Sequence, residues 1–254
     1  MNFFYRFLPI TLFLLFCNSI VATTYDIGTE DIEFYPHYGK TSQNSDKFEG
    51  FAKHFFDDFA SKNNVSIEYV PLPIKRLYSY LLISKSIGLK YPDSPNWNIA
   101  QKAKINHEIY YSKPIISYID GVFVHKDNVH FALDDIKKLG VIRGFTPEPF
   151  IKNINHHKVN IIEYSRSDHL LMALEAKRIE AVYINIDVAN YQINSKGISD
   201  VVFSQNLPFT KGTYHISTLN HPNVIKLIDQ YIKENGPYIN ELKEKLKMTT
   251  LISD

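Results

Sequence analysis

Hydrophobic residues follow two different spacings, and stretches of the two kinds alternate along the chain. Phe51, Phe55 and Phe59 recur at every fourth residue, which predicts a helix that buries this stripe in the core. Residues 65–70 alternate apolar and polar positions instead, which predicts a strand. The same patterns predict strands at 24–29, 87–91, 115–124, 141–142, 159–162, 181–186, 201–203 and 212–219, and helices at 50–64, 74–84, 134–138, 147–153, 165–177 and 238–248, with two more beginning near residues 189 and 222.

This order of strands and helices favours an α/β protein in which mostly parallel sheets are flanked by helices. Two extended segments, 115–124 and 207–209, are predicted to cross between two lobes. Two crossings imply that the first lobe contains both ends of the mature chain. We therefore expect a first lobe made of residues 23–120 and 207–254 and a second lobe made of residues 121–206.

The first 22 residues are typical of a secretory signal peptide. Arg6 gives a positive start, residues 7–16 are almost wholly apolar, and Ala22 offers a small residue for cleavage. The apolar run is shorter than the roughly 20 residues of a membrane span, and no second run of that length follows. Cys17 is the only cysteine, and the bulky Phe16 before it disfavours a lipoprotein signal, so the mature chain has neither a disulfide nor a thiol nucleophile. We expect a periplasmic protein that is cleaved near Ala22.

Composition narrows the class of function mainly by exclusion. Hydrophobic residues make up 44% and charged residues 22% of the 254 residues, which is ordinary for a globular protein. The formal net charge is +1, without a basic run or an acidic tail, so nothing favours a nucleic-acid partner or an anionic membrane surface. The 10 histidines are scattered, and no Ser-His-Asp order or metal-spaced cluster stands out. No cofactor and no metal is therefore predicted.

The segment 139–150 carries the central hypothesis about a binding site. Its first half is a short apolar strand, and Arg143 and Gly144 follow at the end of that strand, with Phe145 as an aromatic wall. Thr146 then precedes a proline, which is the order in which an N-cap residue opens a helix. Free N–H groups at a helix start and the arginine fork both favour an anion, so this junction is predicted to hold the acidic end of a small solute. The alternative is an ordinary strand-to-helix turn with a surface arginine.

Aromatic and acidic residues also follow other predicted strands, and ligands of open α/β sheets lie beyond the carboxyl ends of strands. Tyr38 belongs to an aromatic, proline-containing loop, which either lines a pocket mouth or packs under a lid. Asp93 and Trp97 follow a later strand as candidate ligand contacts, although a tryptophan there also suits the covering of a sheet edge. Asp187 is either a ligand carboxylate that faces Arg143 or a plain helix N-cap.

Five short segments occur in an order that is typical of one protein family. They are Tyr35-Pro36-His37-Tyr38, Phe48-Glu49-Gly50-Phe51, Tyr111-Ser112-Lys113-Pro114, Leu133-Asp134-Asp135-Ile136 with the stretch up to Phe150, and Glu180-Ala181-Val182 through Asp187 to Tyr191. In this order the chain resembles the type 2 periplasmic solute-binding proteins of ABC transporters, and most nearly their polar amino-acid-binding branch, solute-binding protein family 3. The resemblance covers nearly the whole mature chain.

The resemblance implies a two-lobed type 2 periplasmic-binding-protein fold that closes on a small polar or zwitterionic solute. By position in the family pattern, Arg143, Gly144 and Thr146 hold a carboxylate and Asp187 holds an ammonium group. We expect a monomer that takes up an amino-acid-like solute together with an ABC permease. A sensory partner of a membrane receptor is the alternative, and a dehydratase-like enzyme on the same scaffold is less favoured, so we expect no catalysis.

One departure from the family pattern bears on the solute. The family usually has Thr-x-x-Arg before the first crossing, and that arginine clamps the α-carboxylate of the substrate. Residues 100–105 read Ala-Gln-Lys-Ala-Lys-Ile here and contain no arginine. Lys104 and Arg76 are the candidate replacements, although a lysine lacks the donor fork of arginine. The missing arginine argues against a standard α-amino acid as the solute.

Overall fold

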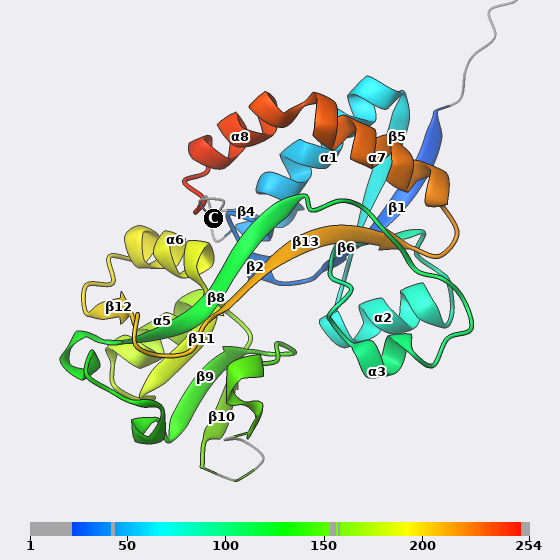
Figure 1. Ribbon diagram of the computed structural model, residues 1–254. Coiled ribbons are helices and arrows are strands. Elements are labelled where there is room, and N and C mark those ends of the chain that lie inside the picture. The colour runs from blue at the N-terminus through cyan, green and yellow to red at the C-terminus, as the bar shows by residue number, and fades with distance from the viewer. Residues whose placement is uncertain (1–21, 42–43, 153–155, 157, 250–254) are drawn as a thin grey trace, which may run out of the picture.

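The protein consists of two lobes joined by two long strands, as the computed structural model shows (Figure 1). The structure describes residues 22–41, 44–152, 156 and 158–249. In this part of the chain, one sheet runs through both lobes in the order β10-β9-β11-β8-β13-β6-β1-β5. The predicted fold, an α/β protein with two lobes of mostly parallel sheet flanked by helices, is confirmed.

The first lobe is built around β1 (Thr23–Glu30), which pairs in parallel with both of its neighbours. The predicted stripe of Phe51, Phe55 and Phe59 lies on α1 (Phe51–Asn63), and all three rings are buried in the same core as Ile27 of β1. The other elements of this lobe are β5 (Val65–Leu72), β6 (Leu89–Asp93), β7 (Tyr110–Tyr111), α2 (Ile74–Leu82), α3 (Ile99–Lys102), α7 (Pro222–Glu234) and α8 (Gly236–Lys245).

The second lobe repeats this arrangement around β9 (Lys138–Ile142), which lies between two parallel neighbours. Leu170, Leu171 and Leu174 of α5 (Ser167–Glu175) face the interior, as the sequence predicts. The remaining elements are β10 (Asn160–Tyr164), β11 (Ala181–Asn185), β12 (Val201–Phe203) and α6 (Ile186–Lys196).

Two antiparallel strands connect the lobes, and both run through the centre of Figure 1. β8 (Ile116–His125) pairs with β13 (Thr210–Thr218) over its first half and with β11 over its second half. β13 then continues into the first lobe, where it pairs with β6. The predicted strand at 212–219 is therefore itself part of the return crossing, and residues 207–209, where the crossing was predicted, lie just before β13.

Two sequence-based assignments of local structure are wrong. The aromatic loop and the polar stretch after it form a small antiparallel sheet of β2 (Glu33–Phe34), β3 (Tyr38–Thr41) and β4 (Asn44–Phe48). The helix predicted at 134–138 is a 3₁₀ turn, Leu133–Asp135, in which the carboxylate of Asp135 accepts a hydrogen bond from the backbone N–H of Ala132 at 2.7 Å. Such local side-chain bonds compete with helix formation.

The predicted signal peptide lies outside the described residues, apart from Ala22. Within the described ranges, none of the helices has the length and the apolar character needed to cross a bilayer. The lobe boundaries derived from the sequence stay a prediction.

Candidate functional site

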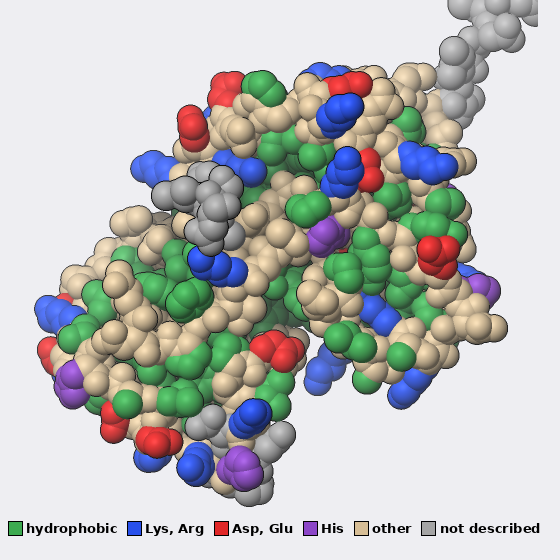
Figure 2. All heavy atoms as spheres, in the orientation of Figure 1, with side chains coloured by type: hydrophobic (Ala, Val, Ile, Leu, Met, Phe, Trp, Pro, Cys, Tyr) green, Lys and Arg blue, Asp and Glu red, His purple; other side chains and the backbone are tan. Residues whose placement is uncertain are grey.

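The crossing strands present one face on which the loops of both lobes converge. Alternate residues of a strand point to the same side, so Tyr118 and Asp120 of β8 share a face with Thr210, Gly212 and Tyr214 of β13. We call these five residues the crossing-strand face. On the surface in Figure 2, a notch separates the two lobes at the bottom of the view.

Gly212 makes room for the aromatic part of this face. A Cβ atom at this position would come within 2.5 Å of the Tyr118 ring, which lies across the glycine. The Tyr118 ring therefore stacks on Tyr214, with ring centroids 4.5 Å apart and an interplanar angle of 20°. Trp97 reaches over from the first lobe and packs against both rings, at centroid distances of 6.0 Å and 5.7 Å. The predicted contact residue Trp97 thus lies on the crossing-strand face and stays partly exposed.

Asp120 is the acidic group of this face. Its Oδ1 accepts one hydrogen bond, at 3.1 Å from Nδ2 of Asn185 at the end of β11, and no other described residue donates to it. Burial, with a smaller contribution from the nearby carboxylates of Glu30 and Asp187, raises the pKa of Asp120 to about 7 against the opposing effect of the Asn185 hydrogen bond.

Glu30 is a second carboxyl group at the junction, at the end of β1. Its side chain is buried, and the Tyr38 hydroxyl donates a hydrogen bond to its Oε2. Burial raises the pKa of Glu30, while the ammonium group of Lys90 acts in the opposite direction. Tyr38, predicted to line a pocket mouth, is thus buried as the partner of Glu30, which accords with the alternative of a packed loop.

Asp93 is fully buried and saturated with hydrogen bonds. Burial alone raises the pKa of a carboxyl group, but here two lysines and a serine hydrogen bond hold the pKa of Asp93 below its ordinary value. A carboxylate with so many donors has no capacity left for a solute. Its partners are Tyr78 Oη at 2.9 Å, Ser217 Oγ at 2.6 Å, Lys102 Nζ at 3.0 Å, the backbone N–H of Ser94 at 2.8 Å and Lys90 Nζ at 3.8 Å.

The predicted anion site after β9 is not built as expected. Arg143 is 67% exposed, with Nε at 3.7 Å from Oε2 of Glu163. The chain forms a 3₁₀ turn at Glu148–Phe150 that starts from Pro147, and the exposed Thr146 makes no side-chain cap. The predicted helix therefore begins at Glu148 as a 3₁₀ turn that continues into helical residues 151–152. The N–H groups of Glu148 and Phe150 are already bonded to backbone carbonyls, so the predicted row of free N–H groups is absent from this turn. The tight turn with prolines at 147 and 149 replaces the first helical turn.

Gly144 and Phe145 form contacts between the lobes. Gly144 has a φ of 91°, a backbone conformation that favours glycine, and a Cβ atom there would lie 3.3 Å from the Ile74 side chain of α2. The Phe145 ring packs edge-on against Phe34 of β2, at a centroid distance of 5.3 Å. These two predicted site residues therefore lie where the second lobe touches the first.

The predicted carboxylate Asp187 is occupied by protein groups. It is 5% exposed, and its Oδ2 lies 3.1 Å from Nε2 of His37, while the backbone N–H of Thr249 donates to its Oδ1 at 2.8 Å. These partners hold the pKa of Asp187 below its ordinary value, although burial acts in the opposite direction. Asp187 is thus not paired with Arg143, and the helix N-cap is Asn185, which accepts from the N–H of Asp187 at 2.9 Å.

The two candidate replacements for the missing family arginine are exposed. Neither the Arg76 side chain nor the Lys104 side chain forms a hydrogen bond or ion pair with another described residue. On α2, Arg76 lies two positions after Ile74, about 200° around the helix, so it points away from the side that meets Gly144.

Sequence reasoning missed Glu30, Asp120 and Asn185. Each is a polar residue at a notable position in a strand. Glu30 and Asn185 are the last residues of β1 and β11, and Asp120 interrupts the long apolar run of β8. A lone carboxylate within an apolar strand indicates a special environment, because an isolated buried charge is unfavourable.

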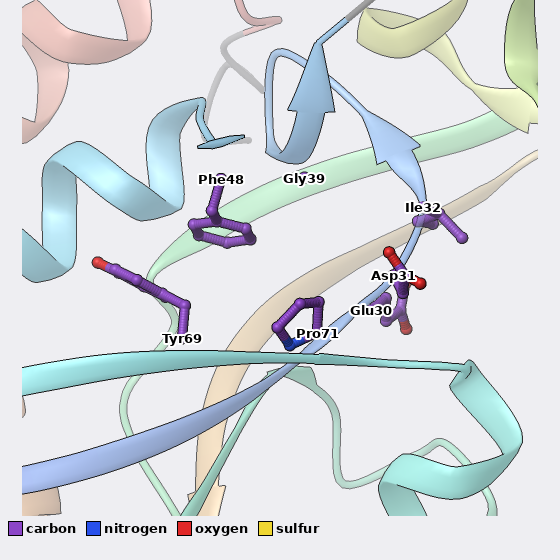
Figure 3. A pocket seen from close by; sticks show the side chains of 7 residues that line it. All are labelled: Glu30, Asp31, Ile32, Gly39, Phe48, Tyr69 and Pro71. Carbon is purple, nitrogen blue, oxygen red and sulfur yellow. The ribbon is translucent and has the colours of Figure 1, made fainter. Parts of the chain in front are cut away.

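A separate hollow of about 260 Å³ lies between the end of β1, β5 and the small sheet (Figure 3). Phe48 and Tyr69 stack within it at a centroid distance of 4.5 Å. It contains no residue of the crossing-strand face. Its lining is Glu30, Asp31, Ile32, Gly39, Phe48, Tyr69 and Pro71.

No protein-family model and no curated protein matches the sequence. Among solved structures, the chain is similar to an ancestral arginine-binding protein bound to arginine, with a TM-score of 0.71 and 21% identity over 88% of this chain and 97% of that one. An arginine transport-system periplasmic binding protein from Legionella pneumophila has a TM-score of 0.68 and 16% identity over 89% of this chain and 100% of that one.

A histidine kinase sensor domain with similarity to periplasmic binding proteins also matches, with a TM-score of 0.70 and 13% identity over 89% of this chain and 96% of that one. Identities at this level carry over the fold and not the ligand. The protein therefore has the two-lobed fold of the amino-acid-binding periplasmic proteins.

Proposed function

We propose that the protein binds a small polar solute between its lobes and delivers it, without chemical conversion, to an ABC-type permease from the periplasm. The observation that carries this proposal is the crossing-strand face. There one oxygen of Asp120 has no donor among the described residues, and aromatic rings of the crossing strands and of the first lobe lie beside it. A few convergent polar groups among aromatic walls are typical of a solute site.

Closure of the lobes is the motion that this proposal requires. The hinge lies near residues 118–122 of β8 and in the segment 206–209 that leads into β13, because these two strands are the long segments shared by both lobes. The contacts of Gly144 with Ile74 and of Phe145 with Phe34 hold the lobes together. A solute favours the closed form only through contacts that it makes better there.

Trp97 offers a direct test, since it is the only tryptophan and lies on the proposed site. We expect native mass spectrometry of the mature protein to reveal a co-purified solute, and titration of the emptied protein with this solute to change the tryptophan fluorescence. In Gly212→Ala, the new Cβ displaces the Tyr118 ring, so binding is expected to weaken at least tenfold. Gly236→Ala is the matched control, because no atom lies within 4 Å of the added carbon.

A sensory role is the second candidate, and the similarity to a histidine kinase sensor domain favours it. The two roles separate in cells. Loss of the gene abolishes accumulation of the radiolabelled solute if the protein serves uptake, and abolishes a transcriptional response without changing uptake if it serves sensing. Mass spectrometry of the solute after prolonged incubation tests the absence of turnover.

A further inference from the structure

The cations near the crossing-strand face are already used by the protein. Lys102 lies 3.0 Å from Oδ1 of Asp93 and donates to the carbonyl of Ser94 at 2.6 Å. Lys90 is fully buried, lies 3.8 Å from the same carboxylate oxygen and donates to the carbonyl of Pro92. Asp93 thus holds both lysines in place, and neither presents a free ammonium group to a solute.

The other basic side chains of the junction are bonded to protein groups or point elsewhere. His37 is bound through Nε2 to Asn185 and Asp187, at 3.0 Å and 3.1 Å. Arg143 is largely exposed beside Glu163, and Arg76 lies on the outer side of α2. Within the described part of the chain, the junction therefore lacks the guanidinium that would clamp the carboxylate of an amino acid.

The carboxyl groups of the junction, in contrast to these basic side chains, have few hydrogen-bond partners in the protein. Among the described residues, Asp120 has a single donor, the neutral Asn185. Glu30 accepts a hydrogen bond from Tyr38, with the Lys90 ammonium as the cation that acts on it. Asp120 also shares its face with the Tyr118 ring, and Trp97 stands over that ring. Aromatic faces attract organic cations, and this attraction grows when water is excluded.

We infer that the solute is a small organic cation, an amine or a guanidine without a carboxylate, and that Asp120 is its counter-ion. This inference rests on the proposed function and narrows its solute class. The cation lies against Tyr118 and Trp97, with its N–H groups directed at the unoccupied oxygen of Asp120, and Glu30 adds a second negative charge nearby. A carboxylate on the same solute would meet these acidic groups and is repelled.

Two matched pairs of probes test this directly by isothermal titration calorimetry of the emptied mature protein at pH 8. Agmatine is arginine without its carboxylate, and cadaverine is lysine without its carboxylate. We expect at least one amine to bind at least tenfold more tightly than its amino acid, about 1.4 kcal/mol. In Asp120→Asn, this binding is expected to weaken at least tenfold, whereas Asp127→Asn, which lies in an exposed loop after the same strand, is expected to leave it unchanged.

A second variant keeps the test decisive if Asp120→Asn folds poorly. Trp97→Leu removes the ring over Tyr118 and is expected to weaken amine binding, and Trp97→Phe is expected to restore most of it. If arginine and lysine both bind as tightly as their decarboxylated partners, the cation inference is overturned but solute binding stays intact. Amine binding that is unchanged in Asp120→Asn also overturns it. Failure to find any co-purified or titrated solute instead counts against the proposed function itself.

Discussion

Asp93 and Asp120 are carboxyl groups on neighbouring parts of the same sheet, and the protein treats them in opposite ways. Asp93 ends β6 and accepts hydrogen bonds from two hydroxyls, a lysine and a backbone N–H, so its pKa is lowered. Asp120 lies on β8 with one amide donor, so its pKa rises to about 7. The difference lies in the partners supplied by the surrounding chain, because burial acts on both in the same direction.

This contrast separates a carboxylate that stabilises the fold from one that the fold leaves incomplete. Buried charges are tolerated when they are paired and hydrogen-bonded, as Asp93 is. A group such as Asp120 destabilises the folded state in its ionised form until something pairs with it. Perturbed groups of this kind are concentrated at functional sites, which is why Asp120 and not Asp93 carries the solute hypothesis.

The largest loss of stability is expected from replacing Asp93, the carboxylate with the full set of hydrogen-bond donors. Asp93→Asn removes the carboxylate that lies against the buried Lys90 and the partly buried Lys102, and removal of one partner of a buried pair typically destabilises by about 3–5 kcal/mol. Urea denaturation at pH 7 measures this loss. Ser217→Ala removes only one of the hydrogen bonds to Asp93 and is expected to destabilise by about 1 kcal/mol. Equal losses in the two variants would contradict the role given to Asp93.

Asp120→Asn is expected to change stability in the opposite direction. The pKa of Asp120 is about 7 in the folded protein and 3.8 in the reference state, so the folded protein keeps a proton that the unfolded chain releases. Stability therefore falls as the pH rises from about 4 to 7, and the asparagine removes this loss. We expect Asp120→Asn to be more stable than the wild type by up to about 4 kcal/mol at pH 8, with no gain near pH 4.

Thermal unfolding of both proteins across this pH range checks the sign. Asp127→Asn serves as the control, because the pKa of Asp127 is lowered by its hydrogen bond to Lys177. That variant removes a stabilising charge and is expected to gain nothing at pH 8. A wild type that grows more stable towards pH 8, relative to Asp120→Asn, would show that Asp120 is not protonated in the folded state.

The same titration links pH to solute affinity. A cation binds the ionised form of Asp120, whose fraction rises about tenfold between pH 6 and pH 8 if the pKa is about 7. Amine affinity is therefore expected to rise about tenfold over this range, and calorimetry in buffers of different ionisation enthalpy is expected to show proton release near pH 7. Glu30, His37 and Asp187 surround the site and stay in place in Asp120→Asn, so a flat profile in that variant assigns the titration to Asp120.

The fold could be predicted largely from the sequence, because it depends on patterns that repeat over many residues. The stripe of Phe51, Phe55 and Phe59 determines which side of α1 is buried, whatever the details of its neighbours. The alternation of strands and helices similarly restricts the sheet to a few topologies. The two predicted crossing segments implied the two lobes, the family resemblance implied them as well, and the similar solved structures have this fold.

The site could not be predicted in the same way, because it depends on register and on individual partners. Tyr118 and Asp120 form a face only because Gly212 lies opposite Tyr118 on a strand more than 90 residues later. Asp187 and Asn185 follow the same strand, but the helix cap and the contact with Asp120 fall to Asn185. Asn185 contacts Asp120, whereas Asp187, only two residues later, is bonded to other protein groups. Hydrophobic periodicity does not distinguish these two positions.

The smallest effect is expected from replacing Arg143, an exposed cation that the proposed amine site does not use. The sequence made it the centre of an anion site, but its side chain is 67% exposed and its nearest carboxylate is Glu163 at 3.7 Å. Exposed pairs of this kind contribute between about 0 and 1 kcal/mol. We expect Arg143→Ala to change the free energy of unfolding by less than about 0.5 kcal/mol and amine affinity by less than about threefold. A tenfold loss of affinity for an acidic solute in this variant would return the anion-binding role to Arg143, because it would mean that solute-driven closure brings the arginine to the ligand.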